Sequence, residues 1–262
     1  MSRSFTYQAL TLRVKPSGES NREAWFLTAE EGLLRATVFG GPKSRLRAGV
    51  APYHQGKLWV YHDPVRDSRK VSDYDVHSYR TGLRELYERA MVAGAVAETI
   101  LASKGGGYSG NEALTLAGSV LDALEGATQA ACSRLGIYFL WHWAHVLGVK
   151  PDLSTCALCG KEPKLDEPLW YVNGKEALFC AACKAMADAS PSGFTASFQS
   201  NPLSAIRVGS GAIRWLKAIE TLPASETIRV SLDAVSLEQA KALPQAVLAG
   251  SFGQRLHTWE GI

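Results

Sequence analysis

Four cysteines carry the clearest chemistry in the sequence. Cys156-Ala-Leu-Cys159 and Cys180-Ala-Ala-Cys183 are two C-x-x-C pairs with 20 residues between them. A two-residue spacer lets both thiolates of a pair face one tetrahedral centre, and two such pairs at this separation are typical of a structural four-cysteine zinc site. We therefore predict one structural Zn²⁺ held by Cys156, Cys159, Cys180 and Cys183.

The same spacing is compatible with two disulfides or with a redox pair. The N-terminus lacks the succession of basic, apolar and small residues that marks a signal peptide, which disfavours disulfides. No βαβ unit is predicted nearby, which disfavours a redox pair. Residues 170–174 predict a short hairpin with an Asn-Gly turn between the pairs. We expect a reduced, cytoplasmic protein in which the fifth cysteine, Cys132, is a small core residue.

A glycine-bounded segment could bind phosphates. Lys43, Arg45 and Arg47 recur at every second position between Gly40 and Gly49. Glycine lets the backbone approach a phosphate chain, and the cations neutralise it. Residues 1–80 hold 13 Lys and Arg against 8 Asp and Glu, whereas residues 81–262 hold 15 against 17. This asymmetry favours a polyanionic partner for the N-terminal part of the chain.

Arg66, Arg69 and Lys70 form a further basic run, and aromatic side chains lie among all these charges. Oligonucleotide-binding barrels use cations for phosphates and rings for stacking on bases. We expect most of the rings in the barrel core, with Tyr53 and Tyr61 at the surface. The six rings are Trp25, Phe39, Tyr53, Trp59, Tyr61 and Tyr74.

Sequence periodicity predicts the elements that position these residues. Leu10, Leu12 and Val14 alternate with Thr11 and Arg13, which indicates a strand with the apolar side chains on one face. Five such short runs, separated by turn residues, predict a small closed barrel with an OB-like fold. The predicted fold class is α+β and multidomain. The predicted domains are a nucleic-acid-binding barrel at 1–80, a helical domain beginning at 81–150, a zinc module at 151–190 and the C-terminal part of the helical domain at 191–262.

Helical spacing of apolar residues begins after the barrel. Asn111 is a predicted N-cap, and residues 128–149 predict a helix that is apolar on all faces, as in the centre of a bundle. Residues 105–110 are expected to form a flexible loop between helices. Ser236-Leu237-Glu238-Gln239 resembles a capping box at the start of a helix. Pro244 should kink or end this helix.

No catalytic constellation is recognisable in the sequence. It contains no G-x-S-x-G, no G-x-x-x-x-G-K-[ST] and no H-E-x-x-H motif. A closed four-cysteine site also leaves no open metal position for water. We therefore do not expect an enzyme. A zinc-containing enzyme that acts on nucleic acid and a non-catalytic interaction scaffold are the alternative function classes.

The order of these features resembles the RecO family of bacterial DNA repair and recombination mediators. Four groups of residues carry the resemblance, and the segment from Trp59 to Lys70 departs from the family pattern. The similar groups are Glu31–Arg35 with Gly40–Arg47 and Pro52 in the barrel, Cys156–Gly160, Cys180–Cys183, and Gly250 with Gly253–Leu256 near the C-terminus.

The resemblance implies a protein that binds single- and double-stranded DNA, anneals complementary strands and helps load RecA onto single strands coated by single-stranded-DNA-binding protein. It implies two protein partners, RecR and the acidic C-terminal tail of single-stranded-DNA-binding protein, and a location at the nucleoid. We expect the helical part after Thr81 to receive the tail. Together with the basic runs, the resemblance assigns DNA binding to Arg35, Lys43, Arg45, Arg47, Arg66, Arg69 and Lys70.

Overall fold

The structure is a computed structural model that describes residues 3–40, 44–107, 110–164, 166–173, 175–189, 205–252 and 256–261. The chain divides into two compact units, residues 1–139 with 256–262, and residues 140–255. Within the described ranges, no helix combines the length and the apolar character needed to cross a membrane.

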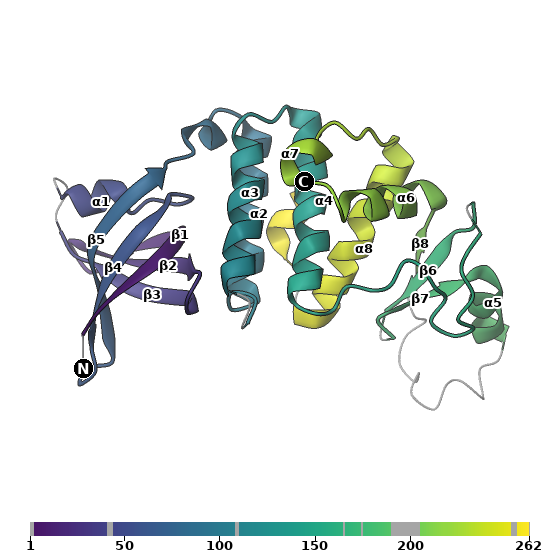
Figure 1. The fold of residues 1–262 in the computed structure, drawn as a ribbon, viewed down its shortest axis with the longest axis horizontal. Helices are drawn as coiled ribbons and strands as arrows, with labels where there is room; N and C mark the ends of the chain where they lie inside the picture. The colour runs from purple at the N-terminus through teal and green to yellow at the C-terminus, as the bar shows by residue number, and fades with distance from the viewer. Residues whose placement is uncertain are drawn as a thin grey trace. The chain divides into compact units, whose positions relative to one another are not determined.

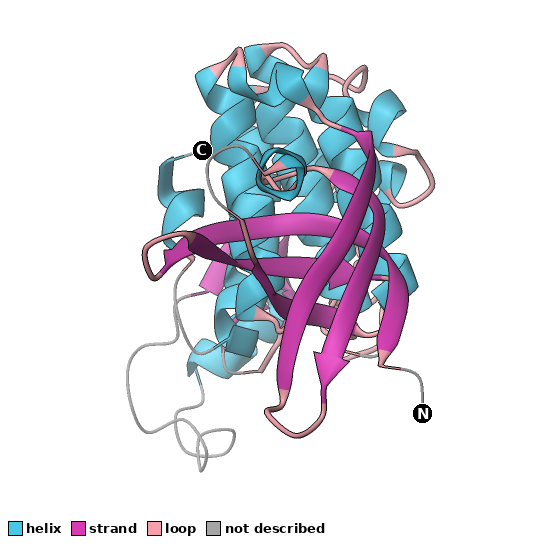
Figure 2. Ribbon diagram, turned by 90° about the vertical axis from the view of Figure 1, so that its left-hand side faces the viewer, coloured by secondary structure: helices cyan, strands magenta, loops and turns pink. Residues whose placement is uncertain are grey.

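A closed barrel forms the N-terminal part of the first unit (Figures 1 and 2). The strands close in the order β1-β2-β3-β5-β4, with β3 and β5 parallel and a short helix, α1, between β3 and β4. This is the arrangement of an OB-like barrel, as the sequence predicts. The bounds are Ser4–Ser17 (β1), Asn21–Thr28 (β2), Gly32–Val38 (β3), Arg45–Gly49 (α1), Gln55–Asp63 (β4) and Ser68–Ser78 (β5).

A bulge in β1 changes which side chains enter the barrel. The register of β1 against β2 shifts between Thr11 and Arg13. Such a shift moves later side chains to the other face of the strand. Val14 therefore packs against the barrel core, whereas Leu10 pairs with Leu27 on the outer side. The prediction that Leu10, Leu12 and Val14 share one face is wrong for this reason.

The outward leucines are covered by helices of the same unit. Leu10 and Leu27 are fully buried, and helix α3 (Gly110–Glu125) packs against β1, β2 and β3. The loop before α3 lies close to strand β3, since a Cβ added to Gly105 would lie 2.8 Å from the backbone nitrogen of Leu33. Gly105 also has a φ of +83°, which favours glycine. Gly105, the first residue of the predicted glycine-rich loop, is thus in packed contact with the barrel, while Tyr108 and Ser109 of this loop lie outside the described residues.

The remaining elements of the first unit are a 3₁₀ turn after the barrel, helices α2 and α3, the first part of α4 and a C-terminal 3₁₀ turn. Trp259 of the last turn is buried and donates a 2.9 Å hydrogen bond from Nε1 to Thr99 of α2. The C-terminal end of the chain is thereby part of the first unit's core. The bounds are Thr81–Arg84 (η1), Tyr87–Ala102 (α2), Gly110–Glu125 (α3), Gln129–Val146 (α4) and His257–Gly261 (η2).

The second unit combines a small sheet with helices. Its sheet has the order β7-β6-β8, and all neighbouring strands are antiparallel. The predicted hairpin is present as β6 and β7, with Val172 and Ala177 as its last pair, so the connection is longer than a two-residue Asn-Gly turn. The bounds are Leu169–Val172 (β6), Ala177–Cys180 (β7), Ala181–Ala189 (α5), Ala205–Val208 (β8), Ser210–Ile219 (α6), Ala224–Thr227 (α7) and Ala234–Phe252 (α8).

Helix α8 corrects the expected start of this helix and decides one of the two outcomes expected at Pro244. It begins at Ala234 instead of after Ser236, and the Asp233 carboxylate accepts the backbone N–H of Ser236 at 2.9 Å. Asp233 therefore satisfies a free N–H of the first turn, as an N-cap does. Of the kink or end expected at Pro244, the structure excludes the end, because Pro244 lies inside α8.

Arg80 joins the barrel to α3 within the first unit. Its side chain is only 1% exposed, and its guanidinium donates to the Asp122 carboxylate at 2.6 Å. It also donates to the Tyr53 carbonyl at 2.9 Å and to Gln55 Oε1 at 2.7 Å. Its backbone is left-handed, with a φ of +47°. Buried charge is tolerated only when it is paired and hydrogen-bonded, as it is here.

We predict that Arg80→Ala lowers the free energy of unfolding by about 3 kcal/mol, because it removes several charge-assisted hydrogen bonds and keeps the strained backbone. Arg80→Gly should cost roughly 1 kcal/mol less than Arg80→Ala, since glycine tolerates the left-handed conformation. Arg84→Ala, at an exposed position four residues on, is the control. Urea unfolding measures all three, and an Arg80→Ala variant as stable as the Arg84→Ala variant would contradict the assignment.

Because His54 is buried, we predict that the protein loses stability in acid. The ring Nδ1 of His54 lies 2.8 Å from the Gly49 carbonyl oxygen, which the neutral ring can reach as a donor. Burial lowers the pKa of His54 below its ordinary value of 6.5, and the bond to Gly49 opposes this only in part. Its contribution to stability is therefore complete above about pH 6.5, the unfolded value, and is lost as the pH falls through the folded pKa.

His54→Asn keeps a donor near Gly49 but does not titrate. Thermal unfolding measured between pH 7 and pH 5 should therefore show a smaller loss of stability in the variant than in the parent protein. Identical pH dependence of the two proteins would sink this account of His54.

Candidate nucleic-acid interface and metal centre

The four paired cysteines converge on one point in the second unit. Their Sγ atoms all lie within 4.8 Å of one another. Four thiolates around one tetrahedral ion with bonds of about 2.3 Å have sulfurs about 3.8 Å apart, so the cluster fits a single metal ion. Cys156, Cys180 and Cys183 are buried and Cys159 is exposed. Cys132, as predicted, is buried outside this cluster.

Local backbone structure holds the cluster together. Gly160, with a φ of +69°, closes the first pair by donating its N–H to the Cys156 carbonyl at 2.9 Å. Ala157 donates to the Leu178 carbonyl at 2.9 Å, which ties the first pair to β7. Cys180 ends β7 and Cys183 lies in the first turn of α5. The β6–β7 hairpin and α5 thus bring the second pair to the first.

The backbone also favours the thiolate form of Cys156. Burial alone raises the pKa of this thiol, but backbone N–H groups of Cys159 and Cys180 donate to its sulfur, and the net pKa is about 6. The Cys180 N–H lies 3.3 Å from Cys156 Sγ. Thiolates are the metal-binding form of cysteine, so these hydrogen bonds suit a metal ligand.

Strand register gathers cations around a tryptophan on the outer side of the barrel. Trp25 of β2 lies directly between Arg13 of β1 and Arg35 of β3. Arg13 and Arg35 are exposed and Trp25 is half-buried. Lys15 Nζ lies 5.8 Å from the centroid of the Trp25 ring, within cation–π range.

A second row extends this surface to β5. In this second row of paired residues, Glu23 of β2 lies between Lys15 of β1 and Thr37 of β3. Thr37 in turn pairs with Lys70 of the parallel strand β5. Lys70 Nζ lies 5.3 Å from the ring centroid of Phe39, which is 44% exposed. Glu23 binds Arg35 at 3.2 Å but is the one acidic member of the two rows among the described residues. We call the following set the outer basic face: Arg13, Lys15, Trp25, Arg35, Phe39 and Lys70.

Of the residues assigned to DNA binding from the sequence, Arg35 and Lys70 thus belong to this face. Arg45 and Arg47 lie on α1, where Arg45 is exposed and Arg47 half-buried. Arg66 is exposed in the β4–β5 turn. Lys43 lies outside the described residues. Arg13 and Lys15 are not among the residues assigned to DNA binding from the sequence, although alternation along β1 already points Arg13 outward.

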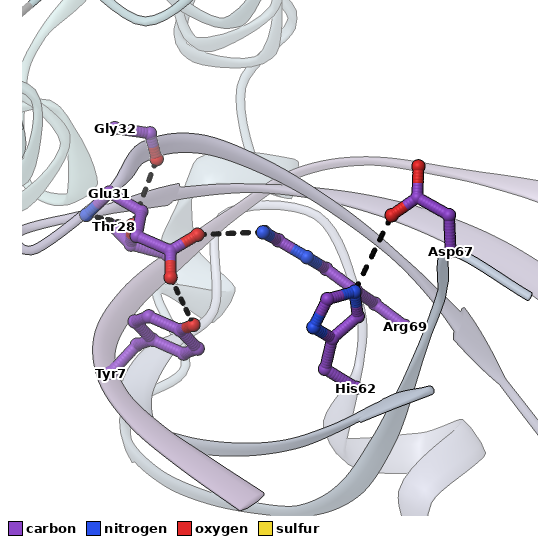
Figure 3. A network of polar contacts seen from close by, with 7 residues as sticks. All are labelled: Tyr7, Thr28, Glu31, Gly32, His62, Asp67 and Arg69. Carbon is purple, nitrogen blue, oxygen red and sulfur yellow. Dashed lines mark hydrogen bonds and ion pairs between the residues drawn. The ribbon is translucent and has the colours of Figure 1, made fainter. Parts of the chain in front are cut away.

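Arg69, like Arg35, is paired with an acidic side chain, whereas Arg45, Arg47, Arg66 and Lys70 form no ion pair among the described residues. Figure 3 shows the Arg69 guanidinium directed at Glu31, with a distance of 2.8 Å from Nη1 to Oε2. Tyr7 donates to the other oxygen of Glu31 at 2.5 Å, and burial, followed by this bond, raises the pKa of Tyr7. The Glu31 N–H donates to Thr28 Oγ1 at 3.1 Å. Arg69 therefore stabilises the β2–β3 turn in the structure.

The aromatic rings are distributed differently from the expectation. Tyr74 is buried and its hydroxyl donates to the His54 carbonyl at 2.8 Å. The other five predicted rings are half-buried or exposed, so the expectation that most of them fill the core is wrong. Tyr53 and Tyr61 are half-buried, whereas Phe39 is the exposed ring. Trp25, Trp59 and Tyr61 lie outside the core because their positions in the strand register point to the outer side of the barrel.

Comparison with known proteins agrees with this architecture. A family model described as Recombination protein O N terminal matches residues 1–80, and one described as Recombination protein O C terminal matches residues 84–200. A DNA repair protein RecO of Nocardioides sp. is 25% identical over 236 residues, which cover 88% of this chain and 94% of that protein.

Two further relatives carry the same printed name. The DNA repair protein RecO of Nostoc punctiforme is 24% identical over 181 residues, and that of Acaryochloris marina is 26% identical over 176 residues. Each match covers 66% of this chain, and the chain spans 59% of the length of these two relatives.

We predict that the purified protein contains about one metal ion per chain, because four converging thiolates form one closed site. Cys183→Ser should lose most of this metal and make the segment around residues 150–189 sensitive to protease, since metal-binding energy contributes to folding. Cys132→Ala, which removes a buried cysteine outside the cluster, should retain the metal. Elemental analysis tests this, and metal-free protein with two disulfides would contradict it.

Proposed function

Because this chain belongs to the recombination protein O family of DNA repair proteins, we propose that it binds DNA through its N-terminal barrel and acts as a mediator of repair and recombination. The observation that carries the proposal is the outer basic face. There, rings and cations alternate at the spacing of neighbouring strands, on the side of β2 and β3 that oligonucleotide-binding barrels use.

The charges of this face suit a single strand. Arg13, Lys15 and Lys70 form no ion pair among the described residues, and Arg35 shares its charge with Glu23 alone. Exposed cations of this kind release counterions when they bind phosphates. Trp25 offers a ring on which a base can stack without sequence preference. Arg45, Arg47, Arg66 and, from the sequence, Lys43 would extend the phosphate contacts beyond the face.

The metal centre has a structural role in this proposal. Four cysteine ligands favour Zn²⁺ over metals that prefer oxygen. They leave no open coordination position, so the ion would hold the hairpin and α5 together without taking part in chemistry.

Family membership supports the remaining proposed activities without showing them for this chain. We propose that the protein anneals complementary strands and helps load RecA onto single strands coated by single-stranded-DNA-binding protein, with RecR as a partner. The helical part after Thr81 would receive the acidic tail of single-stranded-DNA-binding protein. None of these steps requires catalysis by this chain.

The barrel provides a matched pair of tryptophans that tests the proposal. Trp59 on β4 has the same arrangement as Trp25, since it is half-buried on the outer side with Lys57 Nζ 5.2 Å from its ring centroid. It pairs with Asp73 instead of with arginines. An acidic neighbour disfavours phosphates, so Trp59 is the control for Trp25.

We predict that Trp25→Leu weakens binding of a labelled single-stranded oligonucleotide about tenfold, the loss expected for one stacked base. Trp59→Leu should leave the affinity within about twofold of the parent protein, because surface changes away from a site have small effects. Fluorescence anisotropy at one fixed salt concentration measures both. Equal losses in the two variants would show that the outer basic face is not the interface.

A further inference from the structure

A cleft of about 330 Å³ lies where the β1–β2 turn meets α1. Its volume is at the lower end of the range for small-ligand pockets, which suits about one nucleotide unit. Its charged lining consists of Lys15, Arg22, Arg47 and Glu19. Val14 and Pro52 provide apolar surface beside these charges.

The two arginines of the cleft are held close together without an acidic partner. Arg22 Nη1 donates to the carbonyl oxygen of Arg47 at 3.3 Å, and this acceptor is neutral. In the ranges that the structure describes, neither Arg22, Arg47 nor Glu19 forms an ion pair. Burial, and then the charge of Arg47, lower the pKa of Arg22. An anion in the cleft would relieve this unfavourable concentration of positive charge.

We infer that this cleft binds the terminal phosphate of a DNA strand, an inference that rests on the proposed DNA binding of the barrel. Three cations and one acid leave two positive charges. A terminal phosphate carries about −1.5 to −2 at neutral pH, as a phosphate monoester does. An internal phosphodiester carries a single charge, and the strand that contains it must leave the cleft in both directions. It therefore matches the charge of the lining less well.

Lys15 connects the cleft to the outer basic face. It lines the cleft and also lies beside the ring of Trp25. A single strand whose bases stack along the outer basic face can therefore end in the cleft, with its terminal phosphate between Arg22 and Arg47. The barrel then recognises strand ends in addition to binding strands along their length.

The test uses the full chain and three oligonucleotides of one sequence, with a phosphate at the 5′ end, at the 3′ end or at neither end, each with an internal label. The parent protein should bind one of the phosphorylated strands about tenfold more tightly than the strand without a terminal phosphate, the gain expected for one charge-assisted contact. Arg22→Gln should abolish this preference and change the affinity for the unphosphorylated strand much less, since it removes the charge of the cleft and keeps a polar side chain at this position.

Arg47→Gln is a second variant that leaves the carbonyl bound by Arg22 in place, and it should also abolish the preference. Arg229→Gln removes an equal charge at an exposed position of the second unit. This control variant should retain the preference for a phosphorylated strand. Equal binding of all three strands by the parent protein would overturn the inference. So would an Arg22→Gln variant that loses affinity equally for all three, which indicates an internal phosphodiester. Failure of the parent protein to bind any strand would instead refute the proposed DNA binding itself.

Discussion

The first unit depends on one buried cation at the point where the barrel ends. Arg80 lies two residues after the end of β5, and its guanidinium bonds both to the segment that begins β4 and to α3. That segment is itself central, since the His54 carbonyl accepts hydrogen bonds from Thr11 and Tyr74. A guanidinium with five donors can satisfy this many acceptors at once, whereas lysine cannot do so in a fixed plane.

The barrel uses its two outer sides for different purposes, and the bulge in β1 separates them. Before the bulge, Leu10 faces outward and is buried beside Leu27, where α3 packs. After it, Arg13 and Lys15 face outward and are exposed. One strand thus contributes to a hydrophobic contact with helices at one end and to a cationic surface at the other. The register shift allows both without placing a charge in the core.

Local patterns made much of the architecture predictable. Cysteine spacing, turn residues and apolar periodicity predicted the metal cluster, the closed barrel and the helices that follow it, because each contributing element leaves a pattern within a short stretch of sequence. Short or irregular features were not predictable in this way. The strand β8 has only four residues and includes Arg207, so it lacks a clear alternation, and the bulge in β1 leaves no signature in the order of Leu10, Leu12 and Val14.

The candidate interface required long-range register. Nothing local in the sequence indicates that Trp25 lies between Arg13 and Arg35, or that Arg22 approaches Arg47. Arg69 shows the converse case, because its basic run predicts a phosphate contact while its side chain reaches Glu31, 38 residues away in sequence. Charge runs indicate which part of the chain is basic, but pairing decides which charges are available.

The central claim is that the barrel binds DNA through phosphates, and the salt dependence of binding tests it most directly. The affinity of the full chain for a labelled single strand should be measured over a series of salt concentrations. With the four cations of the outer basic face engaged, the logarithm of the association constant should fall linearly with the logarithm of salt concentration, with a slope of about −3 or steeper. A slope near zero would contradict the claim, because it would mean that no phosphate is neutralised on binding.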